Sequence, residues 1–515
     1  MWHATEAPAR LGLLTAALLL TATAALRAQT TWYVDDDAPS DPGPGDPGLS
    51  DPLENGSPQH PFDAIQEGLD AASAGHTVLV LDGTYTGIGN RDLDFHGKAI
   101  TVRAESGPQS CVIDCQGRGR GFFFHSAETG AAIVEGFTIT GGYVSGSSGA
   151  ALLCSLRSAP TIRNCIITGN TAQGQWGGGI SCIGNSNPVL TDCIISANAA
   201  ASGGGISSEN SSPAFIHCTI AENTVQSSGG GISCGGGRPT LVNCTLVANE
   251  ADSGGGIRCS SGLPVLIGCL IAVNTARSLS GGGMYSSGAP MLVNCTIADN
   301  VAYDYGGAIY CFNSHLTLSN CVVWNNAASI PGLVLWWDSE LTISYSDVEN
   351  GQAGVYVAPN CTLHWGDGNI AGLPRFADPA SADYLLTGGS PCIDAADNAA
   401  LPADGFDLDG DGDTLEPLPV DAAGNPRLVD DPGMPDAGNG TPPLADMGAY
   451  EFQGQTCFGD LDGDNQIALS DLAALLSNYG MADGAVYGDG DLERDGDVDL
   501  ADLSALLSVY GSQCP

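Results

Sequence analysis

Two acidic stretches near the end of the chain carry residue types that bind hard cations. One, GDLDGDNQIALSD, begins at Gly459, and the other, GDLERDGDVDLAD, begins 31 residues later at Gly490. Ca²⁺ takes six to eight oxygen ligands, and alternating carboxylates followed by one at loop position 12 supply them. The residues at the ligand positions are Asp460, Asp462, Asp464, Gln466 and Asp471 in the first loop, and Asp491, Glu493, Asp495, Asp497, Asp499 and Asp502 in the second.

Each of these loops runs into the same apolar pattern, LxxLLSxYG, which predicts a short amphipathic helix. The alternative is an acidic loop that is merely solvated. Two copies with the same downstream helix favour two calcium sites, so Ca²⁺ is the expected cofactor.

A third acidic stretch, DLDGDGDTLE, places carboxylates at alternate positions but has Leu418 where a calcium loop needs its last carboxylate. A calcium site and a solvated loop are both left open here. The candidate ligands are Asp407, Asp409, Asp411 and Asp413.

Aromatic residues gather before these acidic segments. Exposed aromatic faces can stack on sugar rings, whereas buried ones would close the end of a hydrophobic core. Both interpretations stay open for the tryptophans, which are Trp324, Trp336, Trp337 and Trp365.

The elements that must position these side chains come from a repeat of about 26 residues, typified by NCTLVANEADSGGGIRC at residues 243–259. A fixed period of this length indicates a solenoid. Each copy is rich in β-branched residues and punctuated by Gly, Asn and Ser, which favours one coil of a parallel β-helix with three short strands. An asparagine follows the apolar run in every copy, at Asn170, Asn198, Asn223, Asn249, Asn274, Asn300 and Asn325.

Cysteines recur in step with the repeat and would stack into two internal columns. We interpret most of them as core; disulfides between coils are the alternative, but stacked parallel strands rarely give the required geometry. The columns are Cys165, Cys193, Cys218, Cys244, Cys269, Cys295 and Cys321, and Cys154, Cys182, Cys234, Cys259 and Cys311.

The residue before the cysteine of the first column is expected at a corner, where asparagine tolerates the left-handed conformation. This column predicts an asparagine ladder. Its members are Asn164, Asn243, Asn294 and Asn320, with Asp192 and His217 as substitutes. The glycine clusters are expected to allow a tight corner and close approach of neighbouring coils.

The N-terminus has the features of an exported protein. Residues 1–28 combine a short N-region, the apolar run LGLLTAALLLTATAAL and a small residue at Ala28, which predicts a signal peptide. Residues 29–56 form a Pro, Gly and Asp-rich segment. Residues 60–73 then show helical spacing, and this helix would cover the open end of the core. We expect a mature protein that is secreted, extracellular or attached to the cell surface, without a transmembrane span.

Composition limits the partners. The chain has 58 acidic residues against 15 basic ones, and its formal net charge is −43. Such a charge argues against nucleic acids and anionic membranes as partners. The 72 glycines and 14% charged residues fit a turn-rich β protein.

The capping helix and the coils together resemble the right-handed parallel β-helix proteins of the pectate-lyase-like superfamily, over residues 57–390. The GGGI phrases are also similar to polymorphic outer-membrane protein repeats. The resemblance implies an all-β, right-handed parallel β-helix with an N-terminal capping helix. It also implies an alternative function, since the fold carries polysaccharide lyases and glycoside hydrolases.

The sequence assigns no catalytic residues. Glu222 and Asp299 share a column but lie about three coils apart, too far for an acid and base pair. Asp304 with Asp338 or Glu340, near Arg277, stays possible. Arg277 or Arg258 beside two exposed acids in the structure would favour an enzyme.

The segments YLLTGGSPCIDAADN, VDAAGNPRL and ADMGAYEFQ, within residues 384–453, resemble the choice-of-anchor Q domain. That resemblance implies attachment to or display on a cell surface.

Residues 457–515 resemble a type I dockerin, a small α-helical module whose calcium-dependent docking implies a cohesin-like receptor. The bracketing Cys457 and Cys514 are similar to a GC-type dockerin variant, which implies a disulfide between them. The usual Ser/Thr pair at loop positions 10 and 11 is absent, since Leu469 and Ser470 stand in one loop and Leu500 and Ala501 in the other. The receptor's identity therefore does not carry over.

Together these features lead to the hypothesis of a secreted, surface-anchored β-helix that binds extracellular polysaccharide or acts as a structural adhesin. Its tether would be the calcium-dependent C-terminal module, held by a cohesin-like receptor or another cell-surface component.

Overall fold

The computed structural model describes residues 30–38, 52–330, 332–431, 434–454, 459–461, 466–481, 485, 490–492 and 497–512. The expected signal peptide, Cys457, Cys514, Asp462, Asp464, Glu493 and Asp495 lie outside the described residues.

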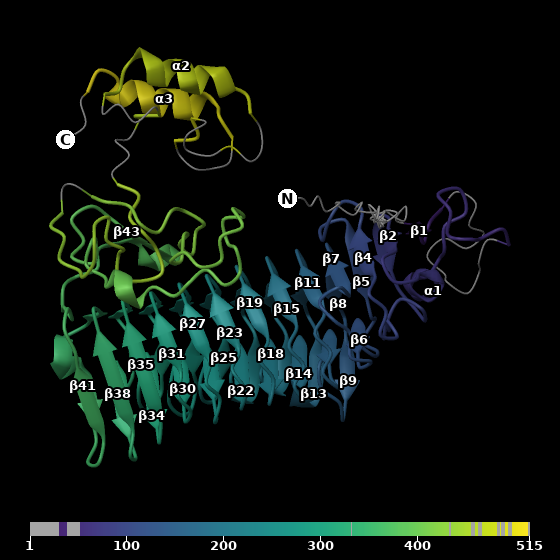
Figure 1. Ribbon diagram of the computed structural model, residues 1–515, viewed down its shortest axis with the longest axis horizontal. Coiled ribbons are helices and arrows are strands. Elements are labelled where there is room, and N and C mark those ends of the chain that lie inside the picture. Colours follow the sequence, from purple (N-terminus) through teal and green to yellow (C-terminus); the bar gives the residue numbers. More distant parts are fainter. Residues whose placement is uncertain are drawn as a thin grey trace, which may run out of the picture.

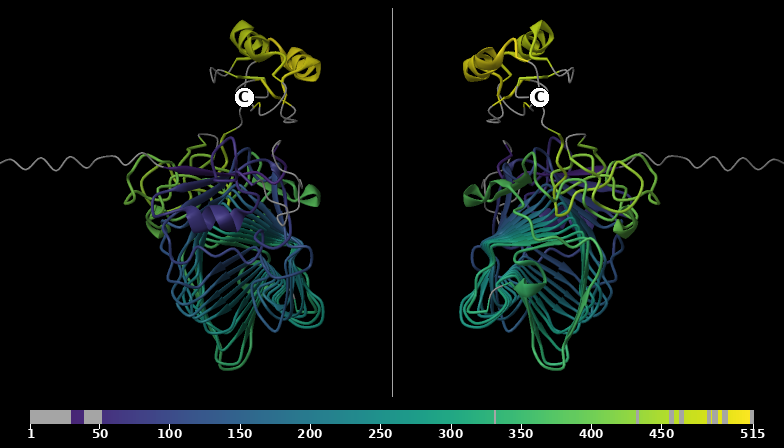
Figure 2. Two further views of the ribbon diagram at one scale, coloured as in Figure 1. Left: turned by 90° about the vertical axis from the view of Figure 1, so that its right-hand side faces the viewer. Right: turned by 90° about the vertical axis from the view of Figure 1, so that its left-hand side faces the viewer.

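A right-handed parallel β-helix of about 11 turns, with about 26 residues per coil, dominates the chain (Figure 1). Seen along its axis, the coils lie directly over one another (Figure 2). Its strands form four parallel sheets, which we number I to IV.

Sheet I has 13 strands: β1 (Thr31–Val34), β2 (Thr77–Val80), β4 (Thr101–Ala104), β7 (Ile133–Glu135), β11 (Thr161–Arg163), β15 (Val189–Thr191), β19 (Ala214–Ile216), β23 (Thr240–Val242), β27 (Val265–Ile267), β31 (Met291–Val293), β35 (His315–Ser319), β38 (Glu340–Ser344) and β41 (Thr362–Trp365). Sheet II has 11 strands: β3 (Gly83–Tyr85), β5 (Cys111–Asp114), β8 (Thr138–Thr140), β12 (Ile166–Thr168), β16 (Ile194–Ser196), β20 (Thr219–Ala221), β24 (Thr245–Val247), β28 (Leu270–Ala272), β32 (Thr296–Ala298), β36 (Val322–Trp324) and β39 (Asp347–Val348).

Sheet III has 10 strands: β6 (Phe122–Phe124), β10 (Leu152–Cys154), β14 (Ile180–Ile183), β18 (Ile206–Glu209), β22 (Ile232–Gly235), β26 (Ile257–Cys259), β30 (Met284–Ser286), β34 (Ile309–Phe312), β37 (Leu333–Trp336) and β40 (Val355–Val357). Sheet IV has seven: β9 (Tyr143–Ser145), β13 (Thr171–Trp176), β17 (Ala199–Ser202), β21 (Thr224–Ser228), β25 (Glu250–Ala251), β29 (Thr275–Ala276) and β33 (Val301–Ala302).

The central coils contain four short strands, one more than the sequence predicts. In one coil, β24 and β25 are separated by Ala248, which is left-handed, and by Asn249, which is fully buried. The left-handed residue turns the chain, and the amide of Asn249 satisfies the backbone groups exposed at this corner. The segment that the sequence suggests as one strand is therefore divided into β24 of sheet II and β25 of sheet IV.

A buried asparagine ladder runs through this corner. Each side-chain oxygen accepts hydrogen bonds from the backbone and side-chain amides of the asparagine one coil earlier, at 3.0–3.1 Å for every step. The ladder ties each coil to its neighbours in one register. Its members are Asn170, Asn198, Asn223, Asn249, Asn274, Asn300 and Asn326. The alignment of the repeats places Asn325 in this column, but that residue is exposed and occupies the left-handed position before Asn326.

The asparagines before the cysteines are left-handed as predicted, with φ between 49° and 55° for them and for their substitutes Asp192 and His217. They do not form a continuous ladder, which corrects that expectation: Asn320 bonds Asn294 at 3.1 Å, but Asn243 contacts His217 at 3.4 Å. This column lies at the outside of the corner, so its amides are free to bind another segment.

Both cysteine columns face the core. In the described part of the chain every cysteine is a free thiol and all but Cys361 are buried. Cys111 and Cys115, close in sequence, are also free and buried. The second column is interrupted by Ser208 and Ser286, which take the same register positions in β18 and β30. The core interpretation of the cysteines is confirmed.

The glycine cluster of each coil forms a corner that no side chain could enter. Gly254 has φ of +63°, and a Cβ on Gly256 would lie 2.6 Å from the carbonyl oxygen of Gly283 in the next coil. Left-handed backbone and close approach of coils both require glycine here. The architectural interpretation of these clusters is confirmed.

Helix α1 (Ile65–Ala71) covers the N-terminal end of the core, as predicted. Ile65 and Leu69 are completely buried. Strand β1 lies in the segment expected to be irregular and pairs with β2 in sheet I.

After β41 the chain turns back along the outside of the β-helix (Figure 1). We call residues 376–431 and 434–454 the return segment. It contains the antiparallel pair β42 (Phe376–Asp378) and β43 (Asp383–Leu386). Corner asparagines hold it: Asn320 and Asn294 donate to the carbonyls of Asp397 and Asp446, each at 3.0 Å. Short 3₁₀ helices flank these elements, at Gly351–Gly354, Pro379–Ser381 and Asn398–Ala400.

Helices α2 (Leu469–Asn478) and α3 (Leu500–Val509) follow the C-terminal loops and pack together through Ile467, Leu475, Val498 and Leu506. Ile467 donates to the carbonyl of Ser512 at 3.0 Å, and Val498 donates to the carbonyl of Met481 at 2.9 Å. The end of the first loop thus lies beside the residues that follow α3, and the end of the second loop lies beside the residues that follow α2. The two loop and helix units are therefore arranged in the same way.

We predict that Asn249→Ala destabilises the β-helix strongly. Asn249 binds the carbonyl of Ile220 and the side chains of Asn223 and Asn274, so its loss leaves several buried groups unpaired, at about 1–3 kcal/mol each. Asn187→Ala removes one exposed hydrogen bond, to the amide of Ser212, and is the control. Denaturant unfolding should separate the two variants; equal midpoints would contradict the ladder's role.

Cys244 should react slowly with a thiol reagent in the native protein. Its side chain is completely buried, and burial raises the pKa of its thiol well above the usual value. Cys361, which is partly exposed, is the internal control and should be labelled first. Cys244→Ala should cost about 1–2 kcal/mol of unfolding free energy as a small cavity, and Cys244→Asp much more. Rapid labelling of Cys244 would show that it does not face the core.

Candidate functional site

Aromatic side chains line the outer surface of sheet III near the C-terminal end of the β-helix. In β30, Met284 and Ser286 are buried in the core, so Tyr285 between them faces outward. Tyr310 of β34, Val334 of β37 and Tyr356 of β40 follow in the same register; Tyr310 is 8% exposed, Val334 is buried and Tyr356 is 38% exposed. We call the aromatic face the set Tyr285, Tyr305, Tyr310, Phe312, Trp336, Trp337 and Tyr356.

The rings of this face contact one another continuously across four coils. Ring centroids are 5.1 Å apart for Tyr285 and Tyr310 and 6.1 Å apart for Tyr310 and Tyr305. Trp336 lies between Tyr305 and Tyr356, with centroids at 5.9 and 6.0 Å and planes within 23° of parallel. The planes of Tyr285 and Tyr310 are inclined by 50°, so the rings form a contiguous stripe along the axis of the β-helix but do not share one plane.

One end of the stripe carries a positive charge, and the other is hollowed. The guanidinium of Arg258 lies 3.9 Å from the ring centroid of Tyr285, a cation–π contact. At the other end, a pocket of about 280 Å³ is lined by Trp336, Trp337, Asp338, Ala358, Pro359 and Asn360. Trp337 is 63% exposed there.

Sequence reasoning grouped four tryptophans, and the structure separates them. Only Trp336 and Trp337 share the aromatic face. Trp324 of β36 packs against the return segment, and Trp365 of β41 packs against the end of the core. Tyr285, Tyr310 and Arg258 were missed, although their spacings of 25 and 27 residues match the repeat.

The candidate acids of the β-helix are also separated. Asp304 precedes β34, whereas Asp338 follows β37 at the opposite end of the sheet III strands. Glu340 lies between His315 and His364, at 3.1 and 2.6 Å. Asp299 accepts a hydrogen bond from the Tyr384 hydroxyl at 2.7 Å. The proposed combination of Asp304 with Asp338 or Glu340 is therefore not assembled.

Arg277 is paired with two different acids. Its guanidinium lies 3.2 Å from Glu250 and 3.8 Å from Asp252, and both carboxylates are more than 40% exposed. This is the arrangement of an arginine beside two exposed acids that would favour an enzyme.

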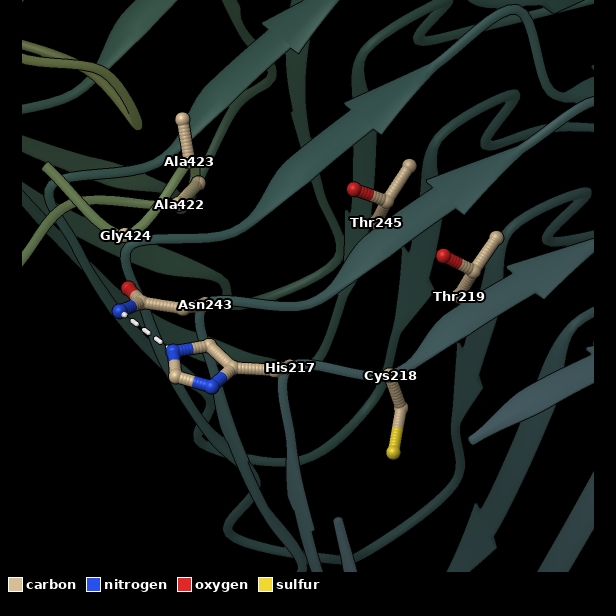
Figure 3. A pocket seen from close by; sticks show the side chains of 8 residues that line it. All are labelled: His217, Cys218, Thr219, Asn243, Thr245, Ala422, Ala423 and Gly424. Atoms are coloured by element: carbon tan, nitrogen blue, oxygen red, sulfur yellow. Dashed lines mark hydrogen bonds between the residues drawn. The ribbon is translucent and has the colours of Figure 1, made fainter. Parts of the chain in front are cut away.

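A second pocket, of about 260 Å³, lies between the corner of the β-helix and residues 422–424 of the return segment (Figure 3). His217 and Asn243 contact each other at its wall, at 3.4 Å, and Asn243 also donates to the carbonyl of Val420 at 3.2 Å. His217 lies 3.8 Å from Asp192. The pocket can accept a small polar molecule.

The C-terminal loops bury their carboxylates at positions 1 and 12. Asp471 and Asp502, at loop position 12, are completely buried, and Asp460 and Asp491, at position 1, are at most 6% exposed. Asp471 accepts hydrogen bonds from the amides of Leu461 and Ala468 at 2.6 and 2.8 Å. Asp502 accepts them from Leu492 and Asp499 at 2.7 and 2.8 Å.

Each position-12 carboxylate thus joins the start of its loop to the start of its helix. Burying carboxylates without a countercharge is costly, and the donors at positions 1 and 12 are the hard oxygen ligands that Ca²⁺ prefers. The described carboxylates at positions 1 and 12 of each loop therefore fit a calcium ion.

The acidic stretch of the return segment forms a compact loop. One carboxylate oxygen from each of Asp407, Asp409 and Asp411 lies within 4.8 Å of the other two. These side chains also accept hydrogen bonds from the loop's own amides, as Asp407 does from Gly412 at 2.9 Å. Asp413 accepts one from Leu415. A calcium site here stays a prediction.

Comparison with known proteins agrees with this architecture. The model of a family described as "Right handed beta helix region" matches residues 99–271 and 240–371. A pectate lyase structure, Pel9A, is similar with a TM-score of 0.46 and 13% identity, covering 72% of this chain and 92% of its own. A rhamnogalacturonan lyase has a TM-score of 0.35 and 11% identity, covering 68% and 91%. No curated protein matches the chain.

None of the helices in the described part of the chain is both long and apolar enough to cross a bilayer.

Removal of calcium should unfold only the C-terminal module. Without cations the buried carboxylates of its loops repel one another, whereas the core of the β-helix is apolar. In calorimetric scans of the full chain, we expect a chelator to lower one transition sharply and leave the main one nearly fixed. Asp460→Ala with Asp491→Ala should reproduce this effect. A chelator that shifts neither transition, or mainly the larger one, would refute the calcium assignment.

Proposed function

This chain belongs to the right-handed β-helix family, and we propose that it is a secreted protein that binds extracellular polysaccharide on its aromatic face. The observation that carries the proposal is the continuous stripe from Tyr285 to Tyr356, in which Trp336 contacts Tyr305 and Tyr356. Aromatic faces pack against the apolar faces of sugar rings, and a stripe along the axis suits an extended chain.

The support under these rings is rigid. The strands that carry Tyr285, Tyr310, Trp336 and Tyr356 are paired in register on both sides or at the edge of sheet III. Binding to a preorganised surface avoids the entropy cost of ordering side chains. The aromatic face therefore favours a ligand that is itself long and repetitive.

The same proposal includes the tether. The dockerin-like module, residues 457–515, would bind Ca²⁺ through its two loops and dock into a cohesin-like receptor or another cell-surface component. The choice-of-anchor Q-like return segment supports attachment at a cell surface. A Cys457–Cys514 disulfide, closing this module, remains part of the proposal.

The net charge of the protein favours neutral polysaccharides over acidic ones as ligands. The net charge of −43 repels polyanions, and Arg258 is the cation at the edge of the aromatic face. We therefore expect neutral polysaccharides to bind more strongly than acidic ones at low salt.

A second candidate function rests on Arg277. With Glu250 and Asp252 beside it, this exposed set could serve a polysaccharide lyase or glycoside hydrolase. It lies on β25, β29 and the residues next to them, away from the strands that carry the aromatic face.

The mature protein should be retained on some member of a panel of cellulose, xylan, chitin and pectin. Trp336→Ala with Trp337→Ala should weaken retention roughly tenfold or more, at about 1 kcal/mol for each lost ring. Trp176→Ala is the control, because Trp176 is half exposed on sheet IV. Co-sedimentation measures retention, and reducing ends or unsaturated products report cleavage.

If Trp176→Ala weakens retention as much as the double variant of Trp336 and Trp337 does, the aromatic face is not the binding surface. Cleavage abolished by Glu250→Gln would support the enzyme instead. No retention on any member would favour a structural adhesin.

A further inference from the structure

The return segment buries more carboxylates than cations. Asp394, Asp421 and Asp446 are completely buried, and Glu451 is 2% exposed. Among the described residues of this segment, Arg427 is the buried cation, and it lies 3.6 Å from Glu451. Buried charges need a countercharge or a full set of hydrogen bonds.

Three of these carboxylates are satisfied inside the segment. Asp446 accepts hydrogen bonds from the amides of Asp394 and Phe452, at 2.8 and 2.6 Å. Glu451 accepts them from Val429 and Asp446, in addition to its contact with Arg427. Asp421 accepts three from nearby backbone amides.

Asp394 is different. Its Oδ2 accepts a hydrogen bond from the amide of Asp431 at 3.2 Å, but its Oδ1 is buried without a hydrogen-bond partner in the described structure. One oxygen of this carboxylate lies within 4.8 Å of an oxygen of Asp430 and an oxygen of Asp436, and those two oxygens are equally close to each other. A fully buried carboxylate thus faces two exposed ones.

The backbone holds this arrangement in place. The amides of Ala437 and Gly438 both donate to the carbonyl of Asp394 at 2.9 Å. The amide of Asp394 is held by Asp446, whose carbonyl accepts from Asn294 of the β-helix. The three carboxylates are therefore fixed close together, although like charges at this distance repel.

We propose that Asp394, Asp430 and Asp436 bind a divalent cation such as Ca²⁺, at a site separate from the C-terminal loops. All three donors are hard oxygens without nitrogen or sulfur, which suits Ca²⁺ rather than Zn²⁺ or Cu²⁺. The ion neutralises the buried carboxylate and gives its unpaired oxygen a partner.

The electrostatics of the site agree with this assignment. Burial, followed by the charges of Asp430, Asp436 and Asp431, raises the pKa of Asp394 to about 6. Ionisation of Asp394 therefore costs more in the folded protein than in the unfolded chain unless a cation is bound. A bound ion reverses the effect, because it favours the ionised carboxylate.

The proposed ion would clamp the loop that carries Asp430 and Asp436 to the part of the return segment that the β-helix holds. Calcium binding should then protect this loop from proteolysis. Leu428 and Met434, which are partly buried, are thermolysin-type sites near it.

The test uses the full mature chain carrying Asp460→Ala and Asp491→Ala, so that the C-terminal loops do not obscure the result. Asp430→Asn with Asp436→Asn removes the two exposed ligands and keeps their shape. Glu222→Gln with Asp367→Asn is the matched control, because it removes two exposed charges elsewhere. Equilibrium dialysis with Ca²⁺ counts the ions bound to each protein after chelator treatment, and far-UV circular dichroism verifies folding.

We expect the Asp430 and Asp436 variant to bind one Ca²⁺ fewer per chain than the control. We also expect Ca²⁺ to slow thermolysin cleavage between residues 428 and 438 in the control and not in the variant. Equal numbers of bound ions would overturn the proposal. If the variant does not fold, unchanged cleavage of the control with and without Ca²⁺ overturns it equally.

Discussion

The buried asparagine ladder is the interaction on which the rest of the structure depends. In every step from Asn170 to Asn326 a side-chain oxygen accepts hydrogen bonds from two amides of the previous coil, in a place that water does not reach. A slip of one residue would break this set and turn the inward side chains outward. The ladder therefore fixes the register of the strands, and the register decides which side chains stack on the outer surface.

The aromatic face follows from that register. Tyr285, Tyr310 and Tyr356 share one register column of sheet III, with Val334 between the last two, and Trp336 contacts Tyr305 and Tyr356. The corner asparagines add a second consequence, since Asn294 and Asn320, besides their contact with each other, bind the return segment. The core of the β-helix is apolar, whereas the acidic regions after it bury carboxylates, for some of which we propose a bound cation.

Much of the fold could be predicted from the sequence, because each coil repeats the same local requirements. The period, the inward cysteines and the left-handed corner at Asn243 all follow from residue type and spacing. The choice between Asn325 and Asn326 could not be made, since both follow the same apolar run and only hydrogen bonding across coils distinguishes them. Strand β1 was missed because a four-residue strand beside a Pro and Gly-rich stretch has too little local signal.

The candidate sites were harder to predict, because they depend on which positions face outward. The tryptophans cluster in sequence but occupy three different surfaces, so Trp324 and Trp365 were grouped with Trp336 only by proximity along the chain. Arg258 and Tyr285 have the correct spacing. However, the sequence of a three-residue strand does not show which of its alternate positions face outward until the register of the strand is known. Asp394 is separated by more than 30 residues from Asp430 and Asp436, and only the folded return segment joins them.

Hydrogen–deuterium exchange of the full chain, with and without the polysaccharide that retains it, tests the central claim most directly. We expect the ligand to slow exchange in peptides that cover β30, β34, β37 and β40. The exchange rates of sheets I and II should stay unchanged. Slower exchange confined to β25 and β29 around Arg277, or to sheet I, would contradict the assignment of binding to the aromatic face.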